Sequence, residues 1–135
     1  QLYKENRMEE TQALDSTNSI EEIKLRKEKI AEIDASILEQ KAKIEFAEAI
    51  TRLKSNPDYQ LVIEQGYFEK EGERLTKNLL EPTYLKRDQI ENIIEMTNAI
   101  RHTKTFLVFK ESDALGAVQN IEELEEYRTS INSEE

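Results

Sequence analysis

The sequence predicts an all-α protein, and three observations support that fold class. The 135 residues include three glycines and two prolines, and 36% are charged, a composition rich in helix formers and poor in turn formers. No proline or glycine occurs before Pro57, so one helix can run through the N-terminal part of the chain. Isoleucines recur there three and four residues apart, the spacing of a coiled coil. We expect a long N-terminal coiled-coil helix, a small antiparallel helical bundle and an acidic C-terminal helix.

The first 18 residues are the least regular part of the predicted fold. Apolar positions are sparse, and residues 15–19 read Asp-Ser-Thr-Asn-Ser, side chains that compete for backbone hydrogen bonds. We therefore interpret residues 1–18 as a flexible or partly helical arm. Ser19 and Glu22 match a capping box, so the long helix is expected to begin at Ser19 and to occupy residues 19–55. A chain that begins with Gln1 is consistent with a fragment, a processed form or a renumbered sequence.

The long helix carries a stripe that we call the heptad seam, formed by Ile23, Ile30, Ile33, Ile37, Gln40, Ile44 and Ala47. These residues occupy the a and d positions of a left-handed coiled coil. β-branched residues at both positions do not fix the number of helices, and Gln40 is a candidate for setting the register. Two partners are compatible with the seam. One is another copy of the chain, which gives a homo-oligomer, and the other is the C-terminal half of the same chain, which gives a hairpin.

The apolar face changes near the end of the long helix. After the seam it shifts to Phe46, Ile50 and Leu53, which predicts a new packing partner there. Asn56 and Pro57 end this helix and can begin the next one as its N-cap and first helical residue. Residues 56–110 are then expected to form the helical bundle.

Glycine and proline divide the predicted bundle. Gly66 and Gly72 predict a kink or a close approach of two helices around residues 66–72. Pro82 and Thr83 predict a stop and a restart. A long amphipathic helix with a broad apolar stripe from Ile90 to Val108 is expected to follow.

The C-terminal segment, residues 111–135, is strongly acidic. It holds eight acidic residues and one basic residue, Arg128, in a chain of formal net charge −10. Residues 112–116 are expected to interrupt the preceding helix because they include Ser112, Asp113 and Gly116. The last helix presents an acidic face containing Glu122, Glu123, Glu125 and Glu126. Such a surface repels phosphate backbones, so direct binding of nucleic acid is not expected.

Residues that could support catalysis or bind a cofactor are scarce. The chain has no cysteine and a single histidine, His102, which lacks the second strong donor that a metal site needs. Glu91 and Glu95 share a helix face and could bind a cation only weakly. Three widely separated glycines cannot form a phosphate-binding loop. We expect no enzymatic activity, no metal, no cofactor and no small-molecule substrate. No apolar stretch is long enough to span a bilayer, so no membrane contact is expected either.

The remaining candidates for function are surfaces that bind another protein. The candidate docking surface comprises Tyr59, Tyr67, Phe68 and Arg74, because rigid aromatic side chains and arginine often anchor interfaces. The alternative role of these aromatic side chains is packing in the core of the bundle.

The stretch NPDYQLVIEQGYFEKEGERLTKNLL resembles a pattern of small helical proteins encoded by tailed bacteriophages. The matching positions are Asn56, Pro57, Tyr59, Val62, Ile63, Tyr67, Phe68, Glu71, Arg74 and Leu75. The resemblance covers roughly residues 50–130. It implies a virion-associated or assembly protein, located in the virion or the host cytoplasm, and it supplies no catalytic residues.

The sequence therefore favours a non-enzymatic bacteriophage structural or assembly protein. It is expected to self-associate through its long helix and to dock on larger virion proteins of the capsid, neck or tail. Two alternatives remain open. One is an acidic inhibitor or adaptor that mimics nucleic acid and binds a host protein, and the other is a scaffolding protein present only during assembly.

Overall fold

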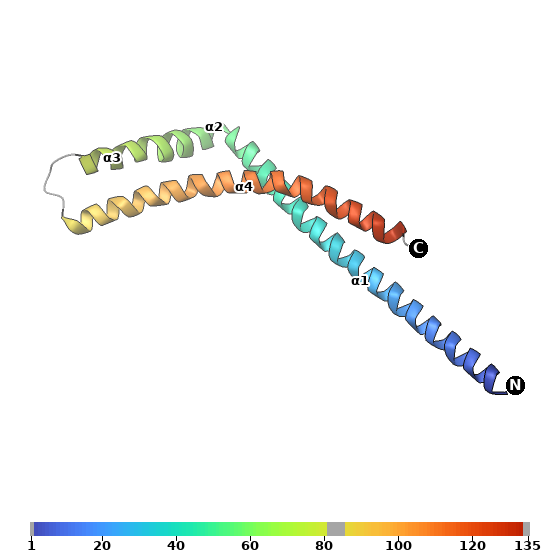
Figure 1. The fold of residues 1–135 in the computed structure, drawn as a ribbon. Helices are drawn as coiled ribbons and strands as arrows, with labels where there is room; N and C mark the ends of the chain where they lie inside the picture. Colours follow the sequence, from blue (N-terminus) through green and yellow to red (C-terminus); the bar gives the residue numbers. More distant parts are fainter. Residues whose placement is uncertain (1, 81–85, 134–135) are drawn as a thin grey trace. The chain divides into compact units, whose positions relative to one another are not determined.

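The computed structural model describes residues 2–80 and 86–133, with side chains described from Thr17 onward. Within these ranges every residue is helical except Ser55, Asn56 and Lys86 (Figure 1). The elements are α1 (Leu2–Lys54), α2 (Pro57–Tyr59), the π-helix η1 (Gln60–Glu71), α3 (Gly72–Leu80) and α4 (Arg87–Ser133). The predicted all-α class and the long N-terminal helix are confirmed.

Helix α1 begins earlier than the sequence predicted. It starts at Leu2 and continues through residues 15–19, so the predicted helix start at Ser19 is wrong. Asp, Ser, Thr and Asn each disfavour a helix interior by no more than about 0.7 kcal/mol relative to Ala. A second helix start would lose hydrogen bonds and require a new nucleation step. Without proline or glycine in this stretch, continuing the helix is the cheaper solution.

The end of α1 agrees with the prediction. The Oδ1 atom of Asn56 accepts hydrogen bonds from the backbone N–H groups of Asp58 at 2.8 Å and Tyr59 at 3.3 Å. Asn56 is thus the N-cap of the next helical segment, and Pro57 occupies its first turn. Both residues act as expected, because proline has no N–H to leave unpaired at that position.

The segment from Gln60 to Glu71 is a π-helix, which the sequence did not predict. In a π-helix each N–H bonds to the carbonyl five residues back, so side chains on one face are spaced more widely than in an α-helix. Half-buried residues here include Ile63, Tyr67 and Phe68, and no residue of η1 is fully buried. At Gly72 the chain returns to α-helix, where we had expected a kink or a close approach.

Helix α4 is one continuous element, so the predicted interruption at residues 112–116 is wrong. The reason is the regularity of its buried face. Buried and half-buried residues recur three and four apart from Ile93 to Ile131, and Ala114 and Ala117 keep that face intact. No proline breaks the backbone ladder, and one exposed glycine costs only about 1 kcal/mol. The break predicted at Pro82 and Thr83 lies outside the described residues.

The chain divides into two compact units. Unit 1 comprises residues 1–40 and 119–135, and unit 2 comprises residues 41–118. The core of unit 1 consists of Ile33, Ile37 and Ile131, with Ile30 and Leu124 packed against it. Two polar contacts of unit 1, Asp34 with Arg128 and Gln40 with Asn120, show that its α1 and α4 segments run antiparallel.

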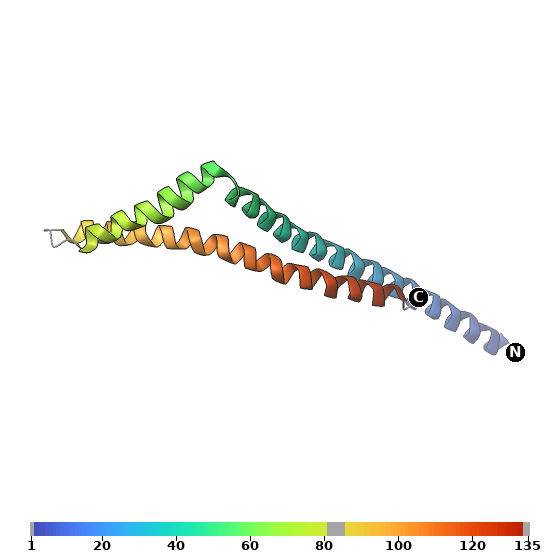
Figure 2. The same cartoon turned by 90° about the horizontal axis from the view of Figure 1, so that it is seen from above.

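The core of unit 2 joins α3 to the N-terminal half of α4, which lie side by side (Figures 1 and 2). Leu75 is completely buried and packs with Ile93 and Ile100. Tyr67, Phe68 and Met96 surround this cluster and are partly buried. Ile50 on α1 and Ala117 on α4 are also buried.

Candidate functional site

The heptad seam is divided between the two units. In unit 1, Ile33 and Ile37 are buried against Ile131, and Ile30 is half-buried beside them. The Nδ2 atom of Asn120 donates a hydrogen bond to Oε1 of Gln40 at 3.2 Å. The partner of this part of the seam is therefore α4 of the same chain, as in the hairpin alternative. Association of two copies of the chain through the heptad seam stays a prediction.

The remaining seam residues are more accessible. Ile23 is 50% exposed. In unit 2, Ile44 and Ala47 are half-buried and line a groove between α1 and α4. The α4 side of this groove includes the exposed side chains of Val108, Leu115 and Val118. Ile33 and Ile37, in the middle of the seam, are thus buried. Apolar surface stays accessible at Ile23 and, in unit 2, in the groove lined by Ile44 and Ala47.

The aromatic residues of the candidate docking surface contribute to packing in unit 2. The rings of Tyr67 and Phe68 lie 5.8 Å apart between centroids, and both touch the cluster around Leu75. The Lys104 ammonium lies 5.3 Å from the centroid of the Phe68 ring, within range of a cation–π interaction. Both rings are half-buried, so they stabilise the unit and offer only part of their surface to a partner.

Two of the four predicted docking residues line a common groove. Tyr59 and Phe68 line one groove of unit 2, together with Lys54 and Lys104. Arg74 is not among the described residues that line that groove, and its guanidinium is paired with Glu71. The Arg74 Nη2 and Nε atoms lie 2.5 Å and 3.0 Å from the two carboxylate oxygens. The hydrogen bonds and charge of Arg74 lower the pKa of Glu71, and the pKa of Arg74 is raised in return.

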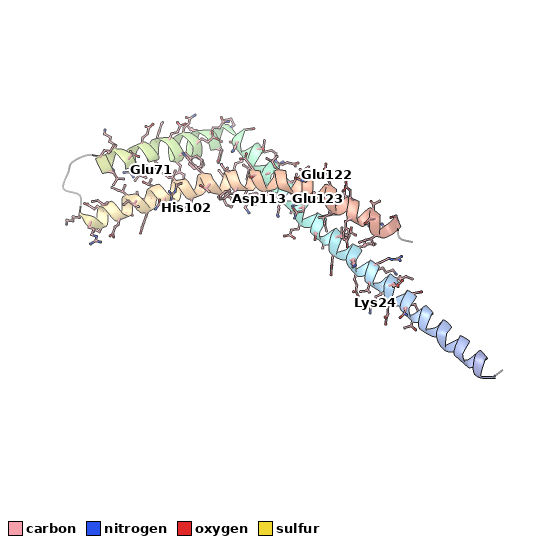
Figure 3. The ribbon with its side chains drawn as sticks, in the orientation of Figure 1. Lys24, Glu71, His102, Asp113, Glu122 and Glu123 are labelled. Atoms are coloured by element: carbon pink, nitrogen blue, oxygen red, sulfur yellow. The ribbon has the colours of Figure 1, made fainter. Side chains whose placement is uncertain are left out.

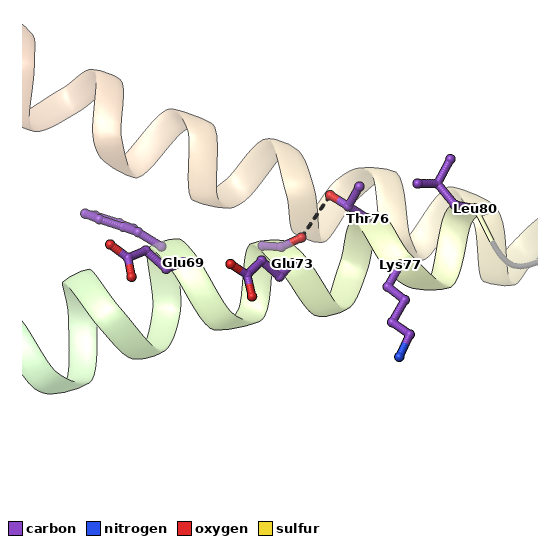
Figure 4. Close-up of a pocket in the computed structure, with 7 residues that line it drawn as sticks. Glu69, Glu73, Thr76, Lys77 and Leu80 are labelled. Atoms are coloured by element: carbon purple, nitrogen blue, oxygen red, sulfur yellow. Dashed lines mark hydrogen bonds between the residues drawn. The ribbon is translucent and has the colours of Figure 1, made fainter.

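A second pocket is formed by residues of η1 and α3 (Figure 4). Its described lining comprises Phe68, Glu69, Gly72, Glu73, Thr76, Lys77 and Leu80. The Thr76 hydroxyl donates to the Gly72 carbonyl at 2.9 Å, so it is occupied in a helix contact. The other polar groups are two carboxylates and one ammonium. This set contains no nucleophile paired with a base, so nothing in it favours a reaction.

The sequence interpretation missed an exposed aromatic surface in unit 2, which we call the aromatic flank: Phe46, Phe106 and Phe109. The rings of Phe46 and Phe106 meet edge to face, with centroids 6.0 Å apart. The Lys110 ammonium lies 5.8 Å and 5.7 Å from their centroids. The three phenylalanines are 45%, 48% and 63% exposed.

A signal for the aromatic flank was present in the sequence. Residues 106–109 read Phe-Leu-Val-Phe, and four successive helical residues point to all sides of the helix. One buried face can therefore cover only part of such a run. Leu107 is half-buried, whereas Phe106, Val108 and Phe109 are exposed. Consecutive exposed apolar residues on a helix are a mark of a binding surface.

The acidic face of α4 and the single histidine are exposed. Glu122, Glu123, Glu125 and Glu126 all lie on the surface of unit 1, and His102 lies on the surface of unit 2 (Figure 3). Glu91 pairs with Arg87 at 3.4 Å, which reduces its use as a cation ligand beside Glu95. Across the part of the chain with described side chains, no cluster of three or more acidic or histidine residues could hold a metal ion.

Comparison with known proteins does not assign this arrangement. No protein-family model, curated protein or solved structure matches the chain. Among the described helices, none combines the length and apolar character needed to cross a membrane. The surfaces themselves are therefore the basis for a functional proposal.

Proposed function

We propose that this chain is a non-enzymatic assembly protein that self-associates through its long helix and docks on larger proteins. The observation that carries the proposal is an excess of exposed apolar side chains. Eighteen large apolar residues are exposed among those described, whereas eight apolar residues are buried. Apolar surface of this extent on helices marks protein contacts, because burying it in a partner removes it from water.

Self-association is best supported on α1. A long helix gains most of its stability from packing one face against another element. In the N-terminal part of α1, Ile20 and Ile23 share one face and are 66% and 50% exposed. They add apolar surface beyond the part of the heptad seam that α4 buries. A further helix packed there would form a coiled coil or small bundle.

Docking on a larger protein is best supported on unit 2. The aromatic flank there adjoins Lys110, and such aromatic side chains beside a base are typical anchors of interfaces. On the two helices that carry it, Leu53 and Val108 are also 45% and 61% exposed. The resemblance of residues 50–130 to small bacteriophage proteins favours a capsid, neck or tail protein as the docking partner, in the virion or in the infected host.

Light scattering at several protein concentrations tests the self-association. A mass that rises from one chain to two or more with concentration supports the proposal. A strictly monomeric chain at all concentrations would contradict it. Replacing Phe106 and Phe109 by serine should leave the self-association through α1 unchanged, because both residues lie in unit 2.

Mass spectrometry of purified particles tests the bacteriophage role. A structural component is found in mature particles. A scaffolding protein is found in immature shells and is lost from mature ones. Absence from both would contradict a role in the particle.

A further inference from the structure

The N-terminal part of α1 in unit 1 is exposed where side chains are described. The α1 and α4 segments of this unit run antiparallel, and Ile33 packs near Ile131. Ile30 is the most N-terminal described residue of α1 that packs against this core. Of residues 17–29, all are exposed except Arg26, which is half-buried.

This unpartnered part of α1 carries an apolar and basic stripe. Ile20, Ile23, Lys24 and Lys27 are spaced i, i+3, i+4 and i+7, so they share one face of the helix. All four are exposed, and neither lysine forms an ion pair with another described residue. We call these four residues the basic stripe. Among the residues of unit 1 with described side chains, none covers the two isoleucines of this face, which stay 66% and 50% exposed.

A complementary stripe lies on α4 of the same unit. Glu122, Glu125, Glu126 and Thr129 line one shallow depression and have the same i, i+3, i+4, i+7 spacing. We call them the acidic stripe. Its three carboxylates are exposed and form no ion pair with another described residue. Lys24 and Glu122 can be seen on the two helices in Figure 3.

We infer that the occupant of the basic stripe is the acidic stripe of a second copy of this chain. The two stripes have equal length and opposite charge, and each chain carries one of each. A two-fold dimer then forms both contacts at once, because in a symmetric pair each surface meets its complement on the other copy. The N-terminal part of α1 from one copy packs on the α1–α4 hairpin of the other. This inference rests on the proposed self-association and names the surfaces that perform it.

The basic stripe also carries apolar area, because Ile20 and Ile23 are 66% and 50% exposed. The isoleucines of the basic stripe supply apolar area, while the lysines and glutamates fix which surfaces meet. Four lysines facing six glutamates across the two contacts should make the dimer sensitive to salt.

A charge exchange between two variants tests this arrangement. The first variant is K24E/K27E, which makes both stripes acidic, and the second is E122K/E125K, which makes the second stripe basic. Each variant alone should dimerise at least about tenfold more weakly than the wild type, because like charges then meet at both contacts. An equimolar mixture should dimerise like the wild type, since both contacts are again complementary. Sedimentation equilibrium of each sample measures the dissociation constants.

The control is K41E/K43E, which makes the same change of charge at two exposed lysines of α1 outside the basic stripe. It should dimerise like the wild type. Circular dichroism checks that all variants remain helical. As a measurement that needs no variant, raising the salt concentration from about 0.1 M to about 1 M shortens the screening length to about 3 Å and should weaken the wild-type dimer.

The possible outcomes separate this inference from the broader proposal. A wild-type monomer at every concentration overturns both. If the wild type forms an oligomer, but the charge-exchanged variants and high salt leave its dissociation constant unchanged, only the pairing of the stripes is overturned. The proposed self-association then stands. Failure of the mixture to recover, when both variants are helical, also overturns the pairing.

Discussion

The Nε atom of Arg128 donates a hydrogen bond to Oδ1 of Asp34 at 2.8 Å and so joins α4 to α1 across 94 positions of the chain. Arg128 is the single base in residues 111–135. Its partner lies beside Ile33, in the middle of the heptad seam. The ion pair therefore matches the register of the α1–α4 hairpin in unit 1 at the place where the isoleucines are buried.

A double-mutant cycle on this pair should give a small coupling energy. The side chains of Arg128 and Asp34 are 43% and 49% exposed, so water and salt screen their attraction. We expect a coupling of about 0.5–1 kcal/mol between Arg128→Ala and Asp34→Ala in the free energy of unfolding, measured in urea. Arg101→Ala, at an exposed arginine of α4 without a described ion pair, serves as the control and should show no coupling with Asp34→Ala. A coupling of zero for the Arg128 pair would mean that the contact does not contribute to stability.

Burial in unit 1 predicts losses of stability of different size at two neighbouring positions. Ile37 is 8% exposed and packs in the core, whereas Leu38 is 67% exposed. Ile37→Ala should reduce the free energy of unfolding by about 2–3 kcal/mol, through lost burial and the cavity it leaves. Leu38→Ala removes a side chain of the same size and should cost less than about 0.5 kcal/mol in the monomer. Thermal unfolding at low concentration compares them, and equal losses would contradict the burial of the seam by α4.

Much of the fold could be predicted because helical periodicity is a local property of the sequence. Ile33 and Ile37 were identified as seam residues by spacing alone, and both are buried. The N-cap role of Asn56 was predictable because proline constrains the residue before it. The predicted boundaries at Ser19 and at residues 112–116 were wrong because the residues there are only weak helix breakers. In long helices a continuous packed face or an unbroken hydrogen-bond ladder outweighs penalties of up to about 1 kcal/mol at single residues.

The candidate surfaces were harder to predict because exposure depends on tertiary contacts. Spacing could not decide whether Ile37 meets another copy or α4 of the same chain, since both partners offer the same apolar face. Phe68 was chosen as a docking residue, yet its ring also packs in the core of unit 2. Phe109 lies just outside the apolar stripe predicted from Ile90 to Val108, although four consecutive apolar residues cannot all face one partner. The π-helix of η1 shifted the facing positions in a way that α-helical spacing does not anticipate.

The glycines of η1 and α4 should respond differently to a methyl group. A Cβ atom added at Gly116 meets nothing within 4 Å, whereas at Gly66 it would lie 3.2 Å from the Leu61 carbonyl oxygen. Gly116→Ala should therefore raise the free energy of unfolding by about 0.5–1 kcal/mol, since alanine favours the helix and restricts the unfolded chain. Gly66→Ala should give a smaller gain or a loss, because the π-helical backbone must adjust. Chemical denaturation compares the two variants, and an equal gain at both positions would contradict the tight contact at Gly66.

The ion pair between Arg74 and Glu71 predicts a dependence on pH. Hydrogen bonds from Arg74 lower the pKa of Glu71 in the folded chain. A lowered folded pKa means that the pair stabilises the fold when Glu71 is ionised, above its pKa in the unfolded chain, and that this contribution is lost as the pH falls through the folded value. Arg74→Ala should raise the pKa of Glu71 toward that of an ordinary glutamate, measured by NMR titration of its side-chain carboxyl carbon. Lys70→Ala removes a neighbouring charge without breaking the pair and should leave the pKa low. If Arg74→Ala did not raise the pKa of Glu71, the paired geometry would not persist in solution.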